Sequence, residues 1–251
     1  MAERAFKVRD AARTDAGPVR PENEDAYLAR PFDGLWAVAD GMGGHAMGSW
    51  AARTLTDTLG AAALAGDMQR DTDVVLRAIE SANRSIRDEG EVQGTTIGCT
   101  AAVLLLNPEG YVVSWVGDSR VYLWRDEALS LLTCDHTLVQ EMFDRGHITA
   151  DEAKTHPMGH VVSRAVGAEA TVKIDRVSGP VQVGDLFLLC SDGLPNVASE
   201  AEITRALRER GPAACDDLMA LCLARRAPDN VTMVAVACDE ATFLSIGAKP
   251  A

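Results

Sequence analysis

The chain has 251 residues, a formal net charge of −13 and a hydrophobic fraction of 47%. These values suit one large domain, 1–251, with a sizeable core, and the acidic balance argues against a nucleic acid partner, whose phosphates call for basic surface. No stretch reaches the roughly 18 apolar residues that span a bilayer, and the first residues lack the apolar core of a secretion signal. We therefore expect a cytoplasmic protein that binds neither nucleic acid nor membrane.

The first half of the chain alternates apolar runs of strand length with two segments at helical spacing. In chain order we predict a strand, two helices and four short strands, at 35–39, 50–59, 75–86, 96–106, 111–116, 121–124 and 128–132. The second helix is expected to begin at Asp71 or Thr72, because short polar side chains accept hydrogen bonds from free backbone N–H groups. Residues 107–110 (Asn-Pro-Glu-Gly) are a turn signal, so the strands around them form a hairpin.

The composition changes between about residues 135 and 170, where the chain is polar and carries four of the five histidines. We interpret this segment, with short helical patches at 139–143 and 150–153, as an insert over the sheet. Beyond it we predict two strands, two helices and a strand, at 171–177, 185–190, 199–207, 212–222 and 231–238. Ser199 and Glu202 form a capping box, and Pro212 suits the first turn of the last helix.

Most of these strands follow hairpin signals rather than crossover helices. That order favours an α+β fold of packed antiparallel sheets with helices outside, over a doubly wound parallel sheet. The six cysteines lie mostly in apolar surroundings and form no Cys-x-x-Cys pair, so we predict buried free thiols rather than a zinc site or disulfides.

Short acidic motifs recur along the chain, several of them where an apolar run ends. They are Asn23-Glu24-Asp25, Asp40-Gly41, Gly117-Asp118, Ser191-Asp192-Gly193 and Asp229-Asn230. Carboxylates at strand ends can meet although they are far apart in sequence, and many in one place repel each other unless cations lie among them. Carboxylate and carbonyl ligands select Mg²⁺ or Mn²⁺ rather than zinc. The pattern therefore predicts a site for several cations.

Each motif alone is more often a turn or a cap. Together, Asp40, Asp192 and Asp229 could surround a pair of cations about 3.5–4 Å apart, as in two-metal hydrolases, where a bridging water attacks phosphorus in line. The Gly41 carbonyl is a further candidate ligand, because glycine lets the backbone approach an ion closely.

Arg20 is a candidate phosphate clamp. A guanidinium fork matches phosphate oxygens bidentately. The alternative for this residue is a surface ion pair with Glu22 or Glu24.

The motifs, in order, resemble the PPM family of metal-dependent serine/threonine phosphatases, the type 2C-like enzymes, in their compact bacterial form. The resemblance runs from about Arg13 to Cys238. Its matching segments are 20–25, 38–45, 94–96, 116–120, 135–140, 156–157, 163–167, 190–194 and 229–232. Each segment alone is weak, but the ordered set is very specific.

The resemblance implies a four-layer α-β-β-α sandwich, two antiparallel β-sheets flanked by helices, with a flap insert at about 144–168. It implies that Asp40 bridges two Mn²⁺ or Mg²⁺ ions. Asp192 and Asp229 would hold the first ion, and the Gly41 carbonyl the second.

The resemblance also assigns the residues around these ligands. Arg20 would take the substrate phosphate, and Asp118 with Asp192 would hold a weaker third ion. The residues expected to support the metal waters and ligands are Glu24, Asp25 and Asn230.

Family members act on phosphoserine and phosphothreonine in proteins, and bacterial ones often oppose a partner Ser/Thr kinase, so the resemblance implies these partners. Two alternatives stay open: a pseudophosphatase that serves as a binding module, and a phosphomonoesterase for small molecules. The presence of Asp40, Asp192 and Asp229 favours an active enzyme. Residues 11–17 and 34–40 look most like phosphatases encoded with type VI secretion systems.

Two positions depart from the family's pattern. Met42 stands where eukaryotic relatives place a histidine assigned as general acid, although a serine leaving group still needs a proton. A water near Asp118 could supply it, and His45 is expected to hold the glycine-rich turn. Asn196 stands where an aspartate is often found, so a third cation is expected to bind loosely.

Overall fold

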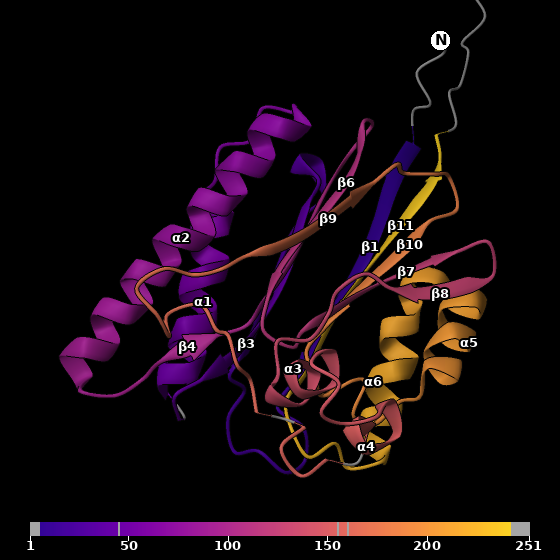
Figure 1. The fold of residues 1–251 in the computed structure, drawn as a ribbon. Coiled ribbons are helices and arrows are strands. Elements are labelled where there is room, and N and C mark those ends of the chain that lie inside the picture. The colour runs from indigo at the N-terminus through magenta and orange to yellow at the C-terminus, as the bar shows by residue number, and fades with distance from the viewer. Residues whose placement is uncertain (1–5, 45, 155, 160, 242–251) are drawn as a thin grey trace, which may run out of the picture.

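The computed structural model describes residues 6–44, 46–154, 156–159 and 161–241. Two β-sheets lie face to face, with α1 and α2 covering one outer side and α5 and α6 the other (Figure 1). The sheet orders are β1-β11-β10-β7-β8 and β2-β3-β5-β6-β9, with β4 paired to β3, and neighbouring strands are antiparallel. The predicted four-layer α-β-β-α sandwich is confirmed.

The elements have the following bounds. The strands of the first sheet are β1 (Phe6–Asp15), β7 (Arg120–Arg125), β8 (Ala128–Leu131), β10 (Leu186–Cys190) and β11 (Val231–Glu240). Those of the second are β2 (Asp25–Arg30), β3 (Leu35–Met42), β4 (Gly98–Cys99), β5 (Ala101–Asn107), β6 (Gly110–Val116) and β9 (Asp175–Gly179). The helices are α1 (Ala46–Gly60), α2 (Met68–Gln93), α3 (Leu138–Asp144), α4 (Ala150–Lys154), α5 (Glu200–Arg210) and α6 (Ala214–Ala224).

Strand β3 shows how the sequence builds the layers. Its side chains alternate, so Leu35, Ala37 and Ala39 join the core beneath α1 and α2, while Trp36 and Val38 join the core between the sheets. A strand buried on both faces reads as a continuous apolar run, which is why it is visible in the sequence. Its polar continuation, Asp40-Gly41, emerges at one end of the sandwich.

Three predicted boundaries are wrong. Helix α2 begins earlier than expected: its N-cap is Asp67, which accepts a hydrogen bond from the Arg70 amide. Asp71 is buried inside the first turn and accepts hydrogen bonds from the Ala65 and Gly66 amides instead. The strand expected at 171–177 begins at Asp175, and the one expected at 96–106 is broken at Thr100.

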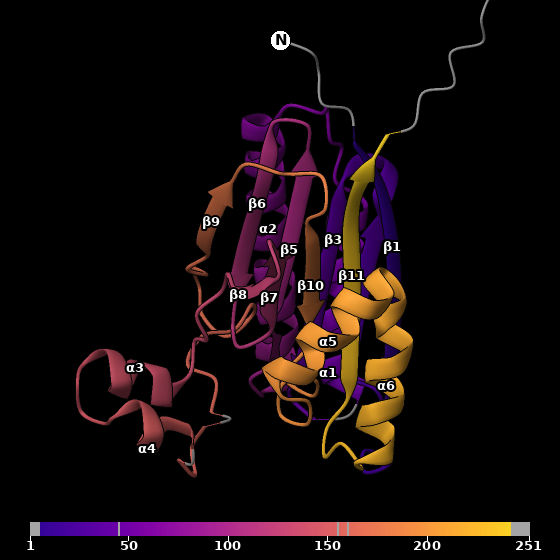
Figure 2. The ribbon, with the colours of Figure 1, turned by 90° about the vertical axis from the view of Figure 1, so that its right-hand side faces the viewer.

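The segment expected to lie over a sheet projects from the sandwich instead. In Figure 2, α3 and α4 stand to one side of the layers. The chain returns through an isolated bridge between Thr137 and Val162 and another between Cys99 and Val166. The insert is therefore fastened at its base, close to the strand ends.

The cysteines are free, as predicted, and five of them are buried while Cys134 is exposed. Within the described ranges, no helix combines the length and the apolar character that a membrane span requires.

The predicted capping box of α5 is present. The Ser199 side chain accepts from the Glu202 amide, and the Glu202 side chain accepts from the Ser199 amide. We expect Ser199→Ala to lower the free energy of unfolding by about 1 kcal/mol, measured by urea titration. Thr204→Ala, in the middle of the same helix, is the control. It should not lower the free energy of unfolding, because alanine has the higher helix propensity. Equal stabilities for both variants would contradict the cap's role.

Candidate metal centre

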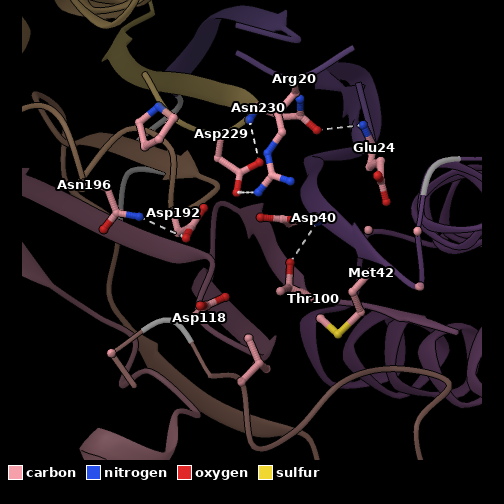
Figure 3. Close-up of a pocket in the computed structure, with 16 residues that line it drawn as sticks. Arg20, Glu24, Asp40, Met42, Thr100, Asp118, Asp192, Asn196, Asp229 and Asn230 are labelled. Carbon is pink, nitrogen blue, oxygen red and sulfur yellow. Dashed lines mark hydrogen bonds and ion pairs between the residues drawn. The ribbon is translucent and has the colours of Figure 1, made fainter. Parts of the chain in front are cut away.

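A cleft of about 820 Å³ opens at the end of the sandwich where β3, β6 and β10 finish and β11 begins. It collects most of the residues predicted for the site. Those that line it are Arg20, Glu24, Asp40, Gly41, Met42, Asp118, Asp192, Asn196, Asp229 and Asn230. Four carboxylates, of Asp40, Asp118, Asp192 and Asp229, point toward the same hollow (Figure 3). Asp25 is not among the residues that line the cleft, and His45 lies outside the described residues.

Asp40 is held through its backbone. Its amide donates to Thr100 Oγ1 at 2.9 Å, and its carbonyl accepts from the Thr100 amide at 2.8 Å. Thr100 Oγ1 also lies 2.6 Å from Ser119 Oγ, next to Asp118 in the chain. The Gly41 amide donates to the Glu24 carbonyl at 3.2 Å. Thr100, at the break between β4 and β5, thus binds both backbone polar groups of Asp40.

Asp25 stands opposite Asp40 in the pairing of β2 with β3 and is 7% exposed. Ser191 Oγ donates to Asp25 Oδ2 at 2.8 Å and accepts from the Thr232 amide at 3.0 Å. Asp25 Oδ1 is buried and has no hydrogen-bond partner in the described part of the chain. Asp25 therefore joins the two sheets while one of its oxygens stays uncompensated.

Arg20 and Asp229 form an ion pair, with Arg20 Nη2 2.7 Å from Asp229 Oδ2. This contact differs from the predicted alternative, in which Arg20 would pair with Glu22 or Glu24. The Asn230 amide donates to the other Asp229 oxygen, Oδ1, at 2.8 Å. Both oxygens of this carboxylate are therefore engaged, and the pair places the guanidinium at the cleft.

Asn230 fastens the loop that carries Arg20 and Glu24. Its Nδ2 donates to the carbonyls of Ala16 and Glu22, each at 2.9 Å, and its Oδ1 accepts from the Glu24 amide at 2.8 Å. Its side-chain nitrogen and oxygen thus both bind the backbone of this loop, and the supporting role toward a metal site stays a prediction.

Asp192 follows β10 and accepts from Asn196 Nδ2 at 3.0 Å through Oδ2. Its Oδ1 is buried and unpartnered among the described residues. In this arrangement Asn196 donates to a carboxylate, whereas an aspartate at the same position would add a further charge.

Burial is the main cause that raises the pKa values of these carboxyl groups, and the charges of neighbouring carboxylates add to it. Burial, and then the charge of Asp192, raises the pKa of Asp118 to about 7. Burial raises the pKa of Asp25 to about 7 as well, with the charges of Asp192 and Asp229 adding to it. Burial and neighbouring carboxylates also raise the pKa of Asp40 and that of Asp192. Ionised together, these groups require positive charge within the cleft.

The donors suit Mg²⁺ or Mn²⁺, since they are carboxylate and carbonyl oxygens with buried, uncompensated members. Among the residues that the structure describes, no three Asp, Glu, His or Cys side chains are already arranged as a formed metal cage. Asp229 is turned to Arg20 and Asp192 to Asn196. Binding would require these two carboxylates to turn from their present partners to the ions, and the donor set fits the ions in its chemistry.

Two residues of this network, Ser191 and Thr100, are not predicted from the sequence. Ser191 belongs to the Ser191-Asp192-Gly193 motif, in which Asp192 is the predicted ligand, and Thr100 lies in the broken strand. Both act through hydroxyl groups on backbone and carboxylate atoms from distant segments. Only the three-dimensional pairing reveals them.

The family model of protein phosphatase 2C matches residues 21–224. The serine/threonine protein phosphatase PstP of Mycobacterium tuberculosis is 38% identical over 244 residues, which cover 93% of this chain and 46% of PstP. The serine/threonine phosphatase Stp of Listeria innocua is 34% identical over 213 residues, covering 79% of this chain and 82% of the relative. The chain thus spans about half the length of PstP.

Solved structures agree in fold. PppA of Pseudomonas aeruginosa, a regulatory component of its type VI secretion system, has a TM-score of 0.86 and 35% identity, covering 92% of this chain and 98% of PppA. The catalytic domain of PstP in complex with two manganese ions has a TM-score of 0.81 and 33% identity, covering 94% of this chain and all of that domain. The chain belongs to the protein phosphatase 2C family.

Proposed function

We propose that this chain is a metal-dependent phosphoprotein phosphatase that hydrolyses phosphoserine and phosphothreonine. The observation that carries the proposal is the meeting of Asp40, Asp118, Asp192 and Asp229 in one cleft beside an arginine. The family and the manganese-bound relative support the same reading.

The cations would be two Mn²⁺ or Mg²⁺ ions, with Asp40 shared between them. Asp192 and Asp229 would hold one ion and the Gly41 carbonyl the other, while Asp118 with Asp192 would hold a weaker third. Bound divalent cations supply charge neutralisation for a phosphate and lower the pKa of water. The residues that would keep this set in place are Glu24, Asp25 and Asn230.

Arg20 would bind the substrate phosphate. Its side chain is half exposed at the cleft and already holds a carboxylate oxygen of Asp229. A phosphate offers the same planar fork two oxygens, so the guanidinium can exchange one acceptor for the other without leaving the site. Met42 lines the same cleft but carries no transferable proton, so the leaving group must be protonated by another donor.

We further propose that the substrates are phosphorylated cytoplasmic proteins, among them a partner Ser/Thr kinase. The insert at 144–168 would act as a flap on the single domain, because Gly159 and Val162 of this insert line the cleft. The likeness to PppA also suits a setting with type VI secretion, but PstP is similar to a comparable degree.

The test is metal-dependent turnover. Purified protein with MnCl₂ should hydrolyse p-nitrophenyl phosphate and a phosphothreonine peptide, should stop in excess EDTA, and should recover when MnCl₂ is restored. If the protein hydrolyses p-nitrophenyl phosphate but no phosphopeptide, the result would favour the small-molecule esterase. Absence of turnover with every divalent cation would favour the binding module.

A further inference from the structure

His136 lies in the loop between β8 and α3 and is 6% exposed. Its Nδ1 accepts from the Gly117 amide at 3.1 Å, and its backbone amide donates to the Gly117 carbonyl at 2.9 Å. One residue thus holds both polar groups of the glycine that immediately precedes Asp118.

The other ring nitrogen fixes the orientation of the imidazole. Because Nδ1 is an acceptor, the proton of the neutral ring is assigned to Nε2, which lies 3.0 Å from Asp175 Oδ2 and donates to it. The ring also stacks on Trp115, with centroids 6.1 Å apart and planes 20° from parallel. The acceptor that faces Gly117 therefore has little freedom to turn away.

Thr100 is a second residue that fixes the Asp118 turn. Gly117 has a φ of 98°, and a Cβ atom added there would lie 2.7 Å from Thr100 Cγ2. Ser119 bonds the Thr100 hydroxyl that also receives the Asp40 amide. Thr100 thus connects the turn to Asp40, and His136 connects it to the insert.

His136 also holds the returning segment of the insert. Its carbonyl accepts from the Ser163 amide at 2.7 Å, next to Val162, which lines the cleft. The same residue thus contacts the Asp118 turn and the base of the insert.

We propose that His136 is a positioning residue that fixes the Asp118 turn against the base of the insert, so that the Asp118 carboxylate is presented to the cleft. The role rests on the proposed phosphatase function, and His136 itself touches neither substrate nor cation. Residues that orient metal ligands in this way typically change metal affinity or activity by 10–100-fold when they are replaced.

Two variants separate the acceptor from the bulk of the ring. His136→Leu fills the space but removes the acceptor, whereas His136→Asn places Oδ1 near the position of Nδ1. Hydrogen exchange of peptides that span residues 117–119 reports on the order of the Asp118 turn, and the measurement does not depend on enzymatic activity. We expect roughly tenfold faster exchange in His136→Leu and near-native exchange in His136→Asn.

Turnover of p-nitrophenyl phosphate against MnCl₂ concentration is the second measurement. His136→Leu should lower kcat about tenfold and raise the MnCl₂ concentration required, with little change in KM for the phosphate ester. His136→Asn should recover most of the loss. Cys134→Ser, in the same loop and exposed, is the control and should match the wild type in both measurements.

Wild-type exchange and a wild-type MnCl₂ requirement in His136→Leu would overturn the proposal. So would equal losses in the leucine and asparagine variants, because the ring would then act only through packing. If the wild type itself shows no turnover, the phosphatase function fails, while amide exchange and the MnCl₂-induced shift in Tm still decide the role of His136.

Discussion

Asp192→Ala is expected to reduce turnover at least about a hundredfold and to remove the rise in Tm that we expect MnCl₂ to cause in the wild type. Asp192 is the carboxylate proposed for both the first and the third cation, and its Oδ1 is buried without a partner among the described residues. In EDTA the same variant should unfold at an equal or higher temperature than the wild type, because a carboxylate whose pKa is raised by burial and by Asp229 is removed. Steady-state kinetics and thermal unfolding, each with and without MnCl₂, measure both effects.

The control for this variant is Asp217→Ala. Asp217 forms an exposed ion pair with Arg210, and such pairs contribute about 0–1 kcal/mol. Asp217→Ala removes the same chemical group and the same charge as Asp192→Ala, at a residue that does not line the cleft. Wild-type turnover in Asp192→Ala, or equal behaviour of the two variants in MnCl₂, would show that the cations are held elsewhere.

Gly48→Ala should lower activity roughly tenfold or more and raise the MnCl₂ requirement while leaving the fold intact. Gly48 is in the first turn of α1, and a Cβ atom added there would lie 1.8 Å from Glu24 Oε2. The end of the flexible Glu24 side chain can move, so the methyl group displaces the carboxylate rather than the helix. Alanine also has the higher helix propensity, which offsets part of the strain. Kinetics at varied MnCl₂ concentration measure the loss of activity, and urea titration measures any change in the free energy of unfolding.

The matched control is Gly60→Ala, at the other end of α1. A Cβ atom there meets only Leu28 Cδ1, at 3.6 Å, which is an ordinary contact. It should keep wild-type activity. In a Glu24→Ala background, Gly48→Ala should lower activity no further, since the carboxylate that the new methyl group would displace is absent. A full additional loss in that background would mean that Gly48 acts through the backbone of Gly41 instead.

The sequence predicts the parts of the fold whose burial is continuous or periodic. The run before Asp40 is buried on both faces, and α1 and α2 each bury one apolar stripe, so each leaves a pattern in the chain. The carboxylates of the cleft were also predictable, because each stands beside a strand end and like charges in one place demand a cation.

Other features leave no such pattern. Strand β1 is an edge strand with charged side chains, so neither it nor β2 is visible as an apolar run. The pairing of Arg20 with Asp229 joins residues that are 209 positions apart. The space that Gly48 leaves for Glu24 depends on how closely α1 approaches β3, which no local propensity encodes.

The place of β11 in its sheet has a consequence for how the protein is made. β11 is the last strand along the described chain, yet it lies between β1 and β10 and pairs with β1 over ten residues. During synthesis β1 is made before the other described strands, and its partner β11 is made after all of them. Asp229 and Asn230, which immediately precede β11, reach the cleft at the same late moment. A growing chain therefore cannot assemble the site piece by piece, and any activity begins only once the first sheet has closed.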